Sequence, residues 1–270
     1  MTLVLTLRKR PEQRLDLSPL VPHLLAGKSA ASINSIELQT TKVRVTVGDA
    51  FRLRMGDAGR IRIEGACERL DGVGAGMSRG AITVAGDVGI QAGRLMTGGR
   101  LIIGGDTGHW AASGMKGGEI EIKGSAGDRL GGPIAGEIAG MRGGLVIVRG
   151  DAGARAGDKM RRGTILIEGS ASDYAGSRMI AGTLIVRRKA GALPGYLMKR
   201  GTIIVGEGCT AFSPTFVDCG MHALLAMRLM AGFLKPYSPR TAALLQRPLR
   251  RYAGDMAVLG KGELFTGNPD

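Results

Sequence analysis

Along the middle of the chain, apolar and polar positions alternate in short runs that return at a fixed interval. Ile82 and Val84 form one such pair, Leu101 and Ile103 the next, and each run is about five residues long. A period of two with isoleucine and valine dominant predicts a β-strand. A glycine opens each run, and the clear copies begin at Gly80, Gly99, Gly118, Gly144, Gly163, Gly182 and Gly201. The steps between them are 19, 19, 26, 19, 19 and 19 residues.

A methionine keeps the same interval, because each unit ends with Met, two residues and the glycine of the next unit. These methionines are Met77, Met96, Met115, Met141, Met160, Met179 and Met198. Agreement at two independent positions indicates an internal repeat from Gly59 to about Gly206, and repeats this short are single coils of a solenoid. Stacking places equivalent positions about 4.8 Å apart. We therefore expect one buried column of methionines.

A unit of 19 residues is too short for a strand and a crossover helix, which together need about 30. The remaining residues must turn corners, and the glycines allow this because glycine adopts positive φ without steric cost. The sequence thus predicts an all-β fold, a parallel β-helix with coils of about 19 residues. We expect a right-handed coil, because the left-handed hexapeptide type would show a period of six, which is absent.

The flanking segments lack the repeat. We expect residues 1–58 to form an N-terminal cap, residues 59–208 the β-helix, and residues 209–270 a C-terminal helical cap or docking arm. A cap is needed because the first coil would otherwise present an open strand edge.

Within the caps, local patterns predict individual elements. Strands are expected at 3–7, 43–47 and 51–55, and a short helix from Ser18-Pro19 to Gly27. In the C-terminal arm the apolar run Cys219–Leu234 predicts a helix of about four turns, and Pro239 opens a second helix through Leu245.

Two features of the array point outward. The 26-residue step inserts seven residues, Gly132–Ile138, which we expect in a loop at one corner, either a tolerated surface loop or a contact with a neighbouring subunit. The middle strand residues should stack into an apolar stripe of Ile147, Leu166, Ile185 and Ile204, with Ile102 beyond Glu121. Either Met221–Leu234 or another subunit should cover that stripe.

The distribution of charge predicts a row of basic side chains in addition to the apolar stripe. The chain carries 37 Lys and Arg against 23 Asp and Glu, a net charge of +14. Basic residues gather beside the column methionines and should line up at one corner, a row suited to a polyanion or an acidic partner. The candidate binding residues are Lys116, Arg142, Arg161, Arg162, Arg178, Lys199 and Arg200, with Arg79 in an earlier coil. Aromatic residues make up only 4% of the chain, which disfavours a base-stacking nucleic-acid module.

Groups typical of catalysis are sparse. The histidines His23, His109 and His222 form no metal-binding spacing, and the three cysteines form no CxxC pair, so we predict no catalytic residue and no metal site. His109, beside Trp110, is expected at a surface corner. Glycine strings of the GxGxxG type belong to the repeat and open no helix, which excludes a dinucleotide site. Without a secretory signal or an 18-residue apolar run, the chain is expected in the cytoplasm, off the membrane.

The coils resemble a known family. GDKMRRGTILIEGSASDYAGSRMIAGTLIV (157–186) and GGPIAGEIAGMRGG (131–144) are similar to the C subunit of formylmethanofuran dehydrogenase and to that of the related formyltransferase/hydrolase complex. The coils also resemble the C-terminal domain of glutamate synthase large subunits. The resemblance covers roughly residues 40–220. It implies a non-catalytic scaffold that binds no cofactor alone and holds catalytic subunits together in a hetero-oligomer.

The resemblance also suggests what the basic row binds. Methanofuran-type carriers bear glutamate side arms, and such a polyglutamate arm could lie along the row; alternatively, the row is solvated or contacts another protein of the assembly. The partners could be of the redox molybdenum or tungsten dehydrogenase type or of the formyltransferase/hydrolase type, and the arginine-rich composition favours the latter. A more distant alternative is a β-helical carbohydrate-active enzyme, although the outward strand positions show no acidic cluster.

Overall fold

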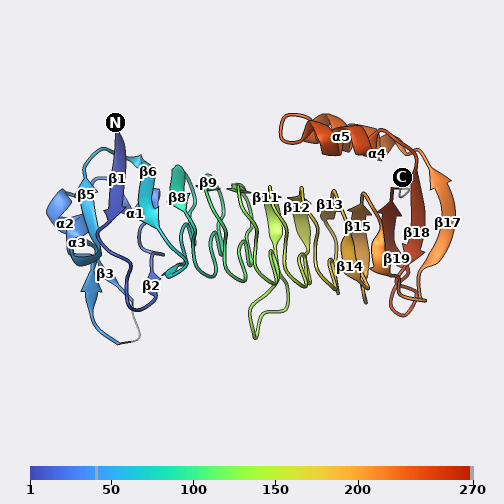
Figure 1. Cartoon of the computed structure of the whole chain (residues 1–270), viewed down its shortest axis with the longest axis horizontal. Coiled ribbons are helices and arrows are strands. Elements are labelled where there is room, and N and C mark those ends of the chain that lie inside the picture. The colour runs from blue at the N-terminus through green and yellow to red at the C-terminus, as the bar shows by residue number, and fades with distance from the viewer. Residues whose placement is uncertain (40–41, 268–270) are drawn as a thin grey trace.

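The computed structural model describes residues 1–39 and 42–267. One sheet runs the length of the molecule (Figure 1), in the strand order β17-β18-β19-β15-β13-β12-β11-β10-β9-β8-β6-β1-β5. Its strands are β1 (Thr2–Leu7), β5 (Phe51–Arg54), β6 (Asp57–Ala66), β8 (Ala81–Gly86), β9 (Arg100–Ile103), β10 (Glu119–Ile122), β11 (Arg142–Val148), β12 (Arg162–Ile167), β13 (Thr183–Val186), β15 (Arg200–Val205), β17 (Val217–His222), β18 (Leu249–Gly254) and β19 (Lys261–Thr266). The prediction of a β-rich chain with few helices is confirmed.

Smaller elements complete the described chain. The strands that pair two by two are β2 (Leu15–Asp16) with β7 (Leu70–Asp71), β3 (Glu37–Leu38) with β4 (Val45–Thr46), and β14 (Ala190–Ala192) with β16 (Cys209–Ala211). The helices are α1 (Pro22–Leu25), α2 (Ala30–Asn34), α3 (Val47–Ala50), α4 (Leu225–Leu234) and α5 (Pro239–Leu245).

Equivalent residues of successive units are in register. The strands from β8 to β15 pair in parallel, so that one row of Cα partners runs through Ile82, Leu101, Ile120, Val146, Ile165, Leu184 and Ile203. A second ladder of single parallel bridges runs from Val88 through Thr107 to Ala190. Figure 1 shows the units as successive turns of chain along one axis.

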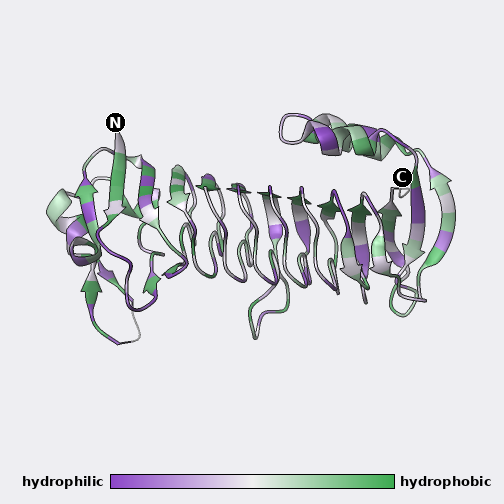
Figure 2. Cartoon of the chain, in the orientation of Figure 1, coloured by the Kyte–Doolittle hydropathy of each residue, from purple (hydrophilic) through white to green (hydrophobic). Residues whose placement is uncertain are grey.

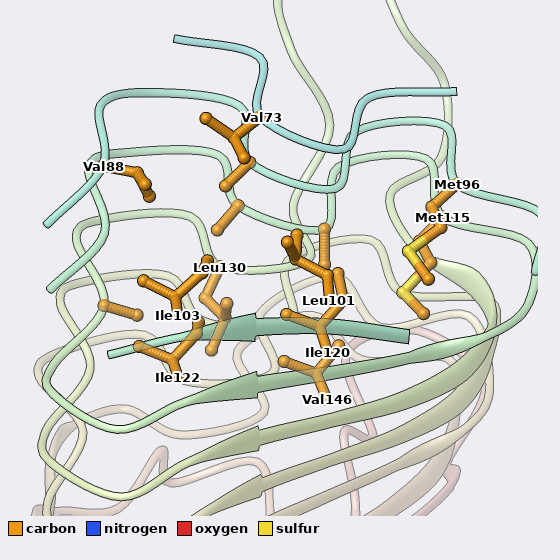
Figure 3. Packing of buried hydrophobic residues seen from close by; sticks show 14 of the residues in the cluster. Val73, Val88, Met96, Leu101, Ile103, Met115, Ile120, Ile122, Leu130 and Val146 are labelled. Carbon is orange, nitrogen blue, oxygen red and sulfur yellow. The ribbon is translucent and has the colours of Figure 1, made fainter. Parts of the chain in front are cut away.

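The core lies inside these turns. All seven column methionines have no exposed surface, which confirms their predicted burial. Figure 3 shows Met96 and Met115 one above the other at one end of the core, with Leu101, Ile120 and Val146 stacked in its middle. Figure 2 shows hydrophobic residues in nearly every strand of the sheet.

The methionine and glycine columns depend on each other. Gly163 has φ +96°, and a Cβ there would lie 2.8 Å from the carbonyl oxygen of Gly144 and 2.8 Å from Cε of Met141. The same arrangement recurs at Gly144 with Met115 and in the following coils. A methionine therefore packs its methyl group where the glycine of the next coil has no side chain, which explains why the two residues repeat together.

Two local predictions in the N-terminal part need correction. The short helix starts at Pro22, not at Ser18-Pro19, because the Ser18 backbone and hydroxyl both donate to the Asp16 carboxylate and hold a turn there. The predicted strand 43–47 is limited to Val45–Thr46, because Thr46 and Asp49 form a capping box that starts α3. The strands at 3–7 and 51–55 are confirmed, as β1 and β5.

In the C-terminal part the predicted helix Cys219–Leu234 is too long. Residues up to His222 form β17, which pairs antiparallel with β18, and α4 begins only at Leu225. The helix from Pro239 to Leu245 is confirmed as α5. After it, β18 leads into β19, which pairs in parallel with β15.

The predicted apolar stripe is present and covered. Ile147, Leu166, Ile185 and Ile204 have no exposed surface and form a second core with residues of α4 and α5, including Met227, Ala231, Leu234, Ala242 and Leu245. Figure 1 shows both helices along one side of the turns. The chain's own C-terminal helices cover the stripe, which is the first of the two predicted alternatives, while Ile102 lies outside this core.

Candidate basic site

The basic residues that follow the column methionines are stacked by the backbone. The amide of Lys116 donates to the carbonyl oxygen of Met96 (2.7 Å), that of Arg142 to Met115 (2.7 Å), and the next two coils continue the pattern. The amide of Lys199 donates to the carbonyl oxygen of Met179 (2.8 Å). One side chain per coil therefore projects from the same corner, with Ile180 as the break in the row.

A second column lies beside the first, at the start of the strands. Arg142 and Arg162 are Cα partners, and so are Arg200 and Lys261. Lys261 extends the predicted row by one coil. Sequence reasoning missed it because it lies on β19, which joins the sheet only after the helical segment. We call the exposed residues Lys116, Arg142, Arg161, Arg162, Lys199, Arg200 and Lys261 the basic row.

No carboxylate in the described part of the chain forms an ion pair with any member of the basic row. The opposite ends of the same strands differ. There Arg149 contacts Glu121 (2.7 Å) and Glu168 (3.5 Å), and Arg187 contacts Glu168 (3.0 Å). Stacked cations about 5 Å apart repel one another unless an anion or water lies between them. The row can therefore receive an anion without first breaking an internal pair.

Arg178 departs from the expected row. Its guanidinium makes two contacts with the Asp158 carboxylate, one of them Nε to Oδ1 at 2.9 Å, and the Ser177 hydroxyl donates to the same Oδ1 at 3.0 Å. Asp158 has no exposed surface. Arg178 thus neutralises a buried carboxylate, and we leave it out of the basic row.

The seven-residue insertion forms a loop over the first members of the row. Arg94 holds it through an ion pair with Glu137 (2.7 Å). Glu137 and Ile138 line a hollow of about 280 Å³ together with Lys116 and Arg142. Figure 1 shows this loop between β10 and β11 projecting from the turns. A ligand on the row would meet the loop at this point.

Repeated acidic residues elsewhere are structural. Asp87 accepts a hydrogen bond from the backbone amide of Asp106 in the next coil (2.8 Å), and Asp106 accepts one from Ser125 (2.7 Å). His109 does the same at another corner, since its Nδ1 accepts from the amide of Asp128 (3.0 Å). These side chains satisfy amides between coils, which accounts for their periodic spacing.

Other chemistry is limited. Within residues 1–39 and 42–267, no group of three or more His, Cys, Asp or Glu is placed to hold a metal ion. In the same ranges no helix is both long and apolar enough to cross a bilayer. Cys67, Cys209 and Cys219 are free thiols, and burial raises the pKa of Cys209 to about 11.

Comparison with known proteins identifies the relatives. The sequence is 51% identical over 263 residues to the C subunit of the formyltransferase/hydrolase complex Fhc of Methylorubrum extorquens, and the match covers 97% of this chain and 98% of the relative. The chain belongs to the family of this C subunit. No protein-family model matches the sequence.

A solved structure shows the same relationship in three dimensions. In the X-ray crystal structure of the formyltransferase/hydrolase complex FhcABCD from M. extorquens with methylofuran, one chain superposes with a TM-score of 0.92 at 43% identity. The superposition covers 98% of this chain and 99% of that one. The resemblance of the coil motifs to the C subunit of the formyltransferase/hydrolase complex is confirmed.

Proposed function

We propose that this chain is the non-catalytic scaffold subunit of a formyltransferase/hydrolase complex. In that assembly, partner subunits transfer a formyl group between tetrahydromethanopterin-type and methanofuran-type carriers and hydrolyse it to formate. The observation that carries the proposal is the match to the C subunit over nearly the full length of both chains. The relative's name favours this type over the molybdenum or tungsten dehydrogenase, and nothing favours the carbohydrate-active alternative.

The scaffold further guides the carrier. The proposed ligand of the basic row is the polyglutamate arm of a methanofuran-type carrier, bound at the level of the complex. Arginine suits this role because its guanidinium takes a carboxylate in a bidentate pair. From the coil of Lys116 to that of Lys199 the row spans about 19 Å at the spacing of stacked strands. An arm on the row would leave the reactive end of the carrier free to reach other subunits.

The test replaces Arg161, Arg162 and Arg200 by Ser and measures carrier KM at low and high salt in the assembled complex. A matched control replaces three exposed basic residues outside the row, Lys28, Lys123 and Arg188. We expect the row variant to raise KM and to lose most of its salt dependence with kcat unchanged, because screened ionic contacts are removed. An unchanged KM and salt slope would contradict the carrier track.

The architecture completes the proposal. We infer a right-handed parallel β-helix over residues 59–208, between an N-terminal cap (1–58) and a C-terminal arm (209–270), acting in the cytoplasm. The parallel register of consecutive strands supports the coil, and crossovers between parallel strands are right-handed in about 98% of cases.

A further inference from the structure

Helix α4 is apolar on two opposite sides. Met227, Ala231 and Leu234 face the stripe of the sheet and are buried. Leu225, Leu229 and Phe233 lie four residues apart on the other side, and 70%, 68% and 54% of their surfaces are exposed. A helix that covers a core needs only one apolar stripe, and clustered exposed side chains of this size mark interaction surfaces. Packing within the chain therefore does not account for the large apolar residues on the outer face of α4.

The surroundings of that face carry one sign of charge. Residues 219–254 contain six Arg and Lys and no Asp or Glu. Two of the six are paired, Arg250 with Asp218 and Arg251 with Glu263. The other four are exposed and form no ion pair with any described residue; they are Arg228, Lys235, Arg240 and Arg247.

A groove beside α5 repeats this charge. It has a volume of about 740 Å³ and lies between α5 and the solenoid edge. Arg240 and Arg247 line it from the helical side, and Arg187 and Lys189 line it from the other. Among the described residues of its wall, only Glu207 brings a carboxylate. The groove thus favours an anionic occupant beside α5, the helix that shares the second core with α4.

We propose that the outer face of α4 and the groove beside α5 together dock a different subunit of the complex. That subunit would present an apolar strip flanked by carboxylates. The inference rests on the proposed assembly and adds to it the surface and the chemistry of the contact. Leu225, Leu229 and Phe233 supply the buried centre of the contact, and the four cations supply its rim.

Charge argues against a second copy as the occupant. A two-fold contact brings the same patch of both chains together. It would place Arg228 and Lys235 opposite or beside their own copies, with no acidic residue of 219–254 to balance them. Like charges at an interface are unfavourable.

Charge placement also argues against a lipid surface. A helix that lies on an anionic membrane carries basic residues on a polar face beside its apolar one. In α4 the second face is buried against the sheet, and Arg228 is the single basic residue of the helix.

Each variant is first co-expressed with the catalytic subunits to test whether it enters the complex. The affinity of each purified variant chain for the catalytic subunits is then measured by titration. One variant combines Leu229→Ser with Phe233→Ser, and another combines Arg228→Glu with Lys235→Glu. The control combines Leu24→Ser with Met55→Ser, two exposed apolar residues of the N-terminal part. We expect the first to weaken binding about 10- to 100-fold, as loss of central apolar anchors does. The second should weaken binding mainly at low salt, and the control should bind like the parent.

The readouts separate the possible failures. Melting of each free chain shows whether a variant is folded, and both docking variants should melt like the parent because these side chains are exposed. If the parent chain enters the complex and the Leu229/Phe233 variant binds equally well, the docking surface is refuted while the assembly stands. If the parent chain does not bind the catalytic subunits, the proposed function fails first. If the parent chain self-associates and the Leu229/Phe233 variant does not, the occupant of this face is a second copy of the chain. If the parent chain floats with anionic lipid vesicles, the occupant is a lipid surface. Either result would refute the proposed partner.

Discussion

Replacing Arg178 by Ser separates a structural arginine from the basic row. The Arg178 side chain is 37% exposed, whereas Asp158 is fully buried and has Ser177 as its other side-chain donor. Breaking a buried ion pair by removing one partner costs about 3–5 kcal/mol. Because water can enter where the partly exposed guanidinium was, we expect a cost just below that range, about 2–3 kcal/mol. For a chain of this size that lowers the melting temperature by about 5–10 °C.

Neighbouring coils supply the compensating change. Ser113 and Ser177 occupy the position equivalent to Asp158, and Leu95 and Leu197 occupy that of Arg178, at φ +55° and +56°. The double variant Asp158→Ser with Arg178→Leu removes both charges and keeps residues that this backbone accepts. We expect it to regain most of the lost stability, because removing both partners leaves no buried charge.

The assay is thermal or urea unfolding of the purified chain, followed by circular dichroism. Arg161→Ser is the matched control, since Arg161 is exposed and unpaired among the described residues, and its expected effect is within about 0.5 kcal/mol. If Arg178→Ser unfolds at the same temperature as Arg161→Ser, the assignment of Arg178 to an internal pair is wrong. If a stable Arg178→Ser variant raises the carrier KM of the assembled complex above that of the parent, Arg178 belongs to the basic row.

Three further predictions test the packing. Met160→Ala should destabilise the chain by about 2–5 kcal/mol in urea unfolding, because a buried side chain is replaced by a cavity; fast oxidation of Met160 by dilute peroxide in the folded chain would contradict its burial. Leu166→Asp with Ile185→Asp places two carboxylates under α4 and α5 and should release both helices, seen as faster amide hydrogen exchange over 225–245. Unchanged exchange there would show that the stripe does not hold the helices. With its pKa at about 11, Cys209 is about one part in a thousand thiolate at pH 8, so iodoacetamide should label exposed Cys219 first; equal labelling rates would show that Cys209 is not shielded.

The positions of the repeated residues could be predicted because each one stacks on the equivalent residue of the next coil. Burial of the methionines, the register of the strands and the alignment of the apolar stripe all follow from a period of 19 residues. The basic row follows in the same way, since backbone hydrogen bonds stack the residue after each methionine. The pair of Arg178 and Asp158 was also within reach, because the two residues lie on adjacent coils at adjoining corner positions.

Elements whose conformation depends on partners far along the chain could not be predicted from the sequence. In the sequence, residues 219–222 adjoin the apolar run that forms α4, and their strand conformation depends on pairing with β18, which follows α5. Lys261 joined the row for the same reason, through the pairing of β19 with β15. The short helix at Pro22 was displaced by a local contact, the turn between Asp16 and Ser18, which propensity alone does not place.

The covering of the stripe by α4 and α5 also determines the order in which parts of the chain can pack during synthesis. Each coil finds its neighbour 19 residues back and can stack as it leaves the ribosome, whereas Ile147 waits for residues as far along as Leu245. About 100 residues separate the two, which at translation rates of about 5–20 residues per second leaves the stripe uncovered for about 5–20 s. During that interval a nascent chain presents a row of stacked aliphatic side chains to the cell. A chaperone at the ribosome exit, or a partner protein made nearby, would find its first binding site there.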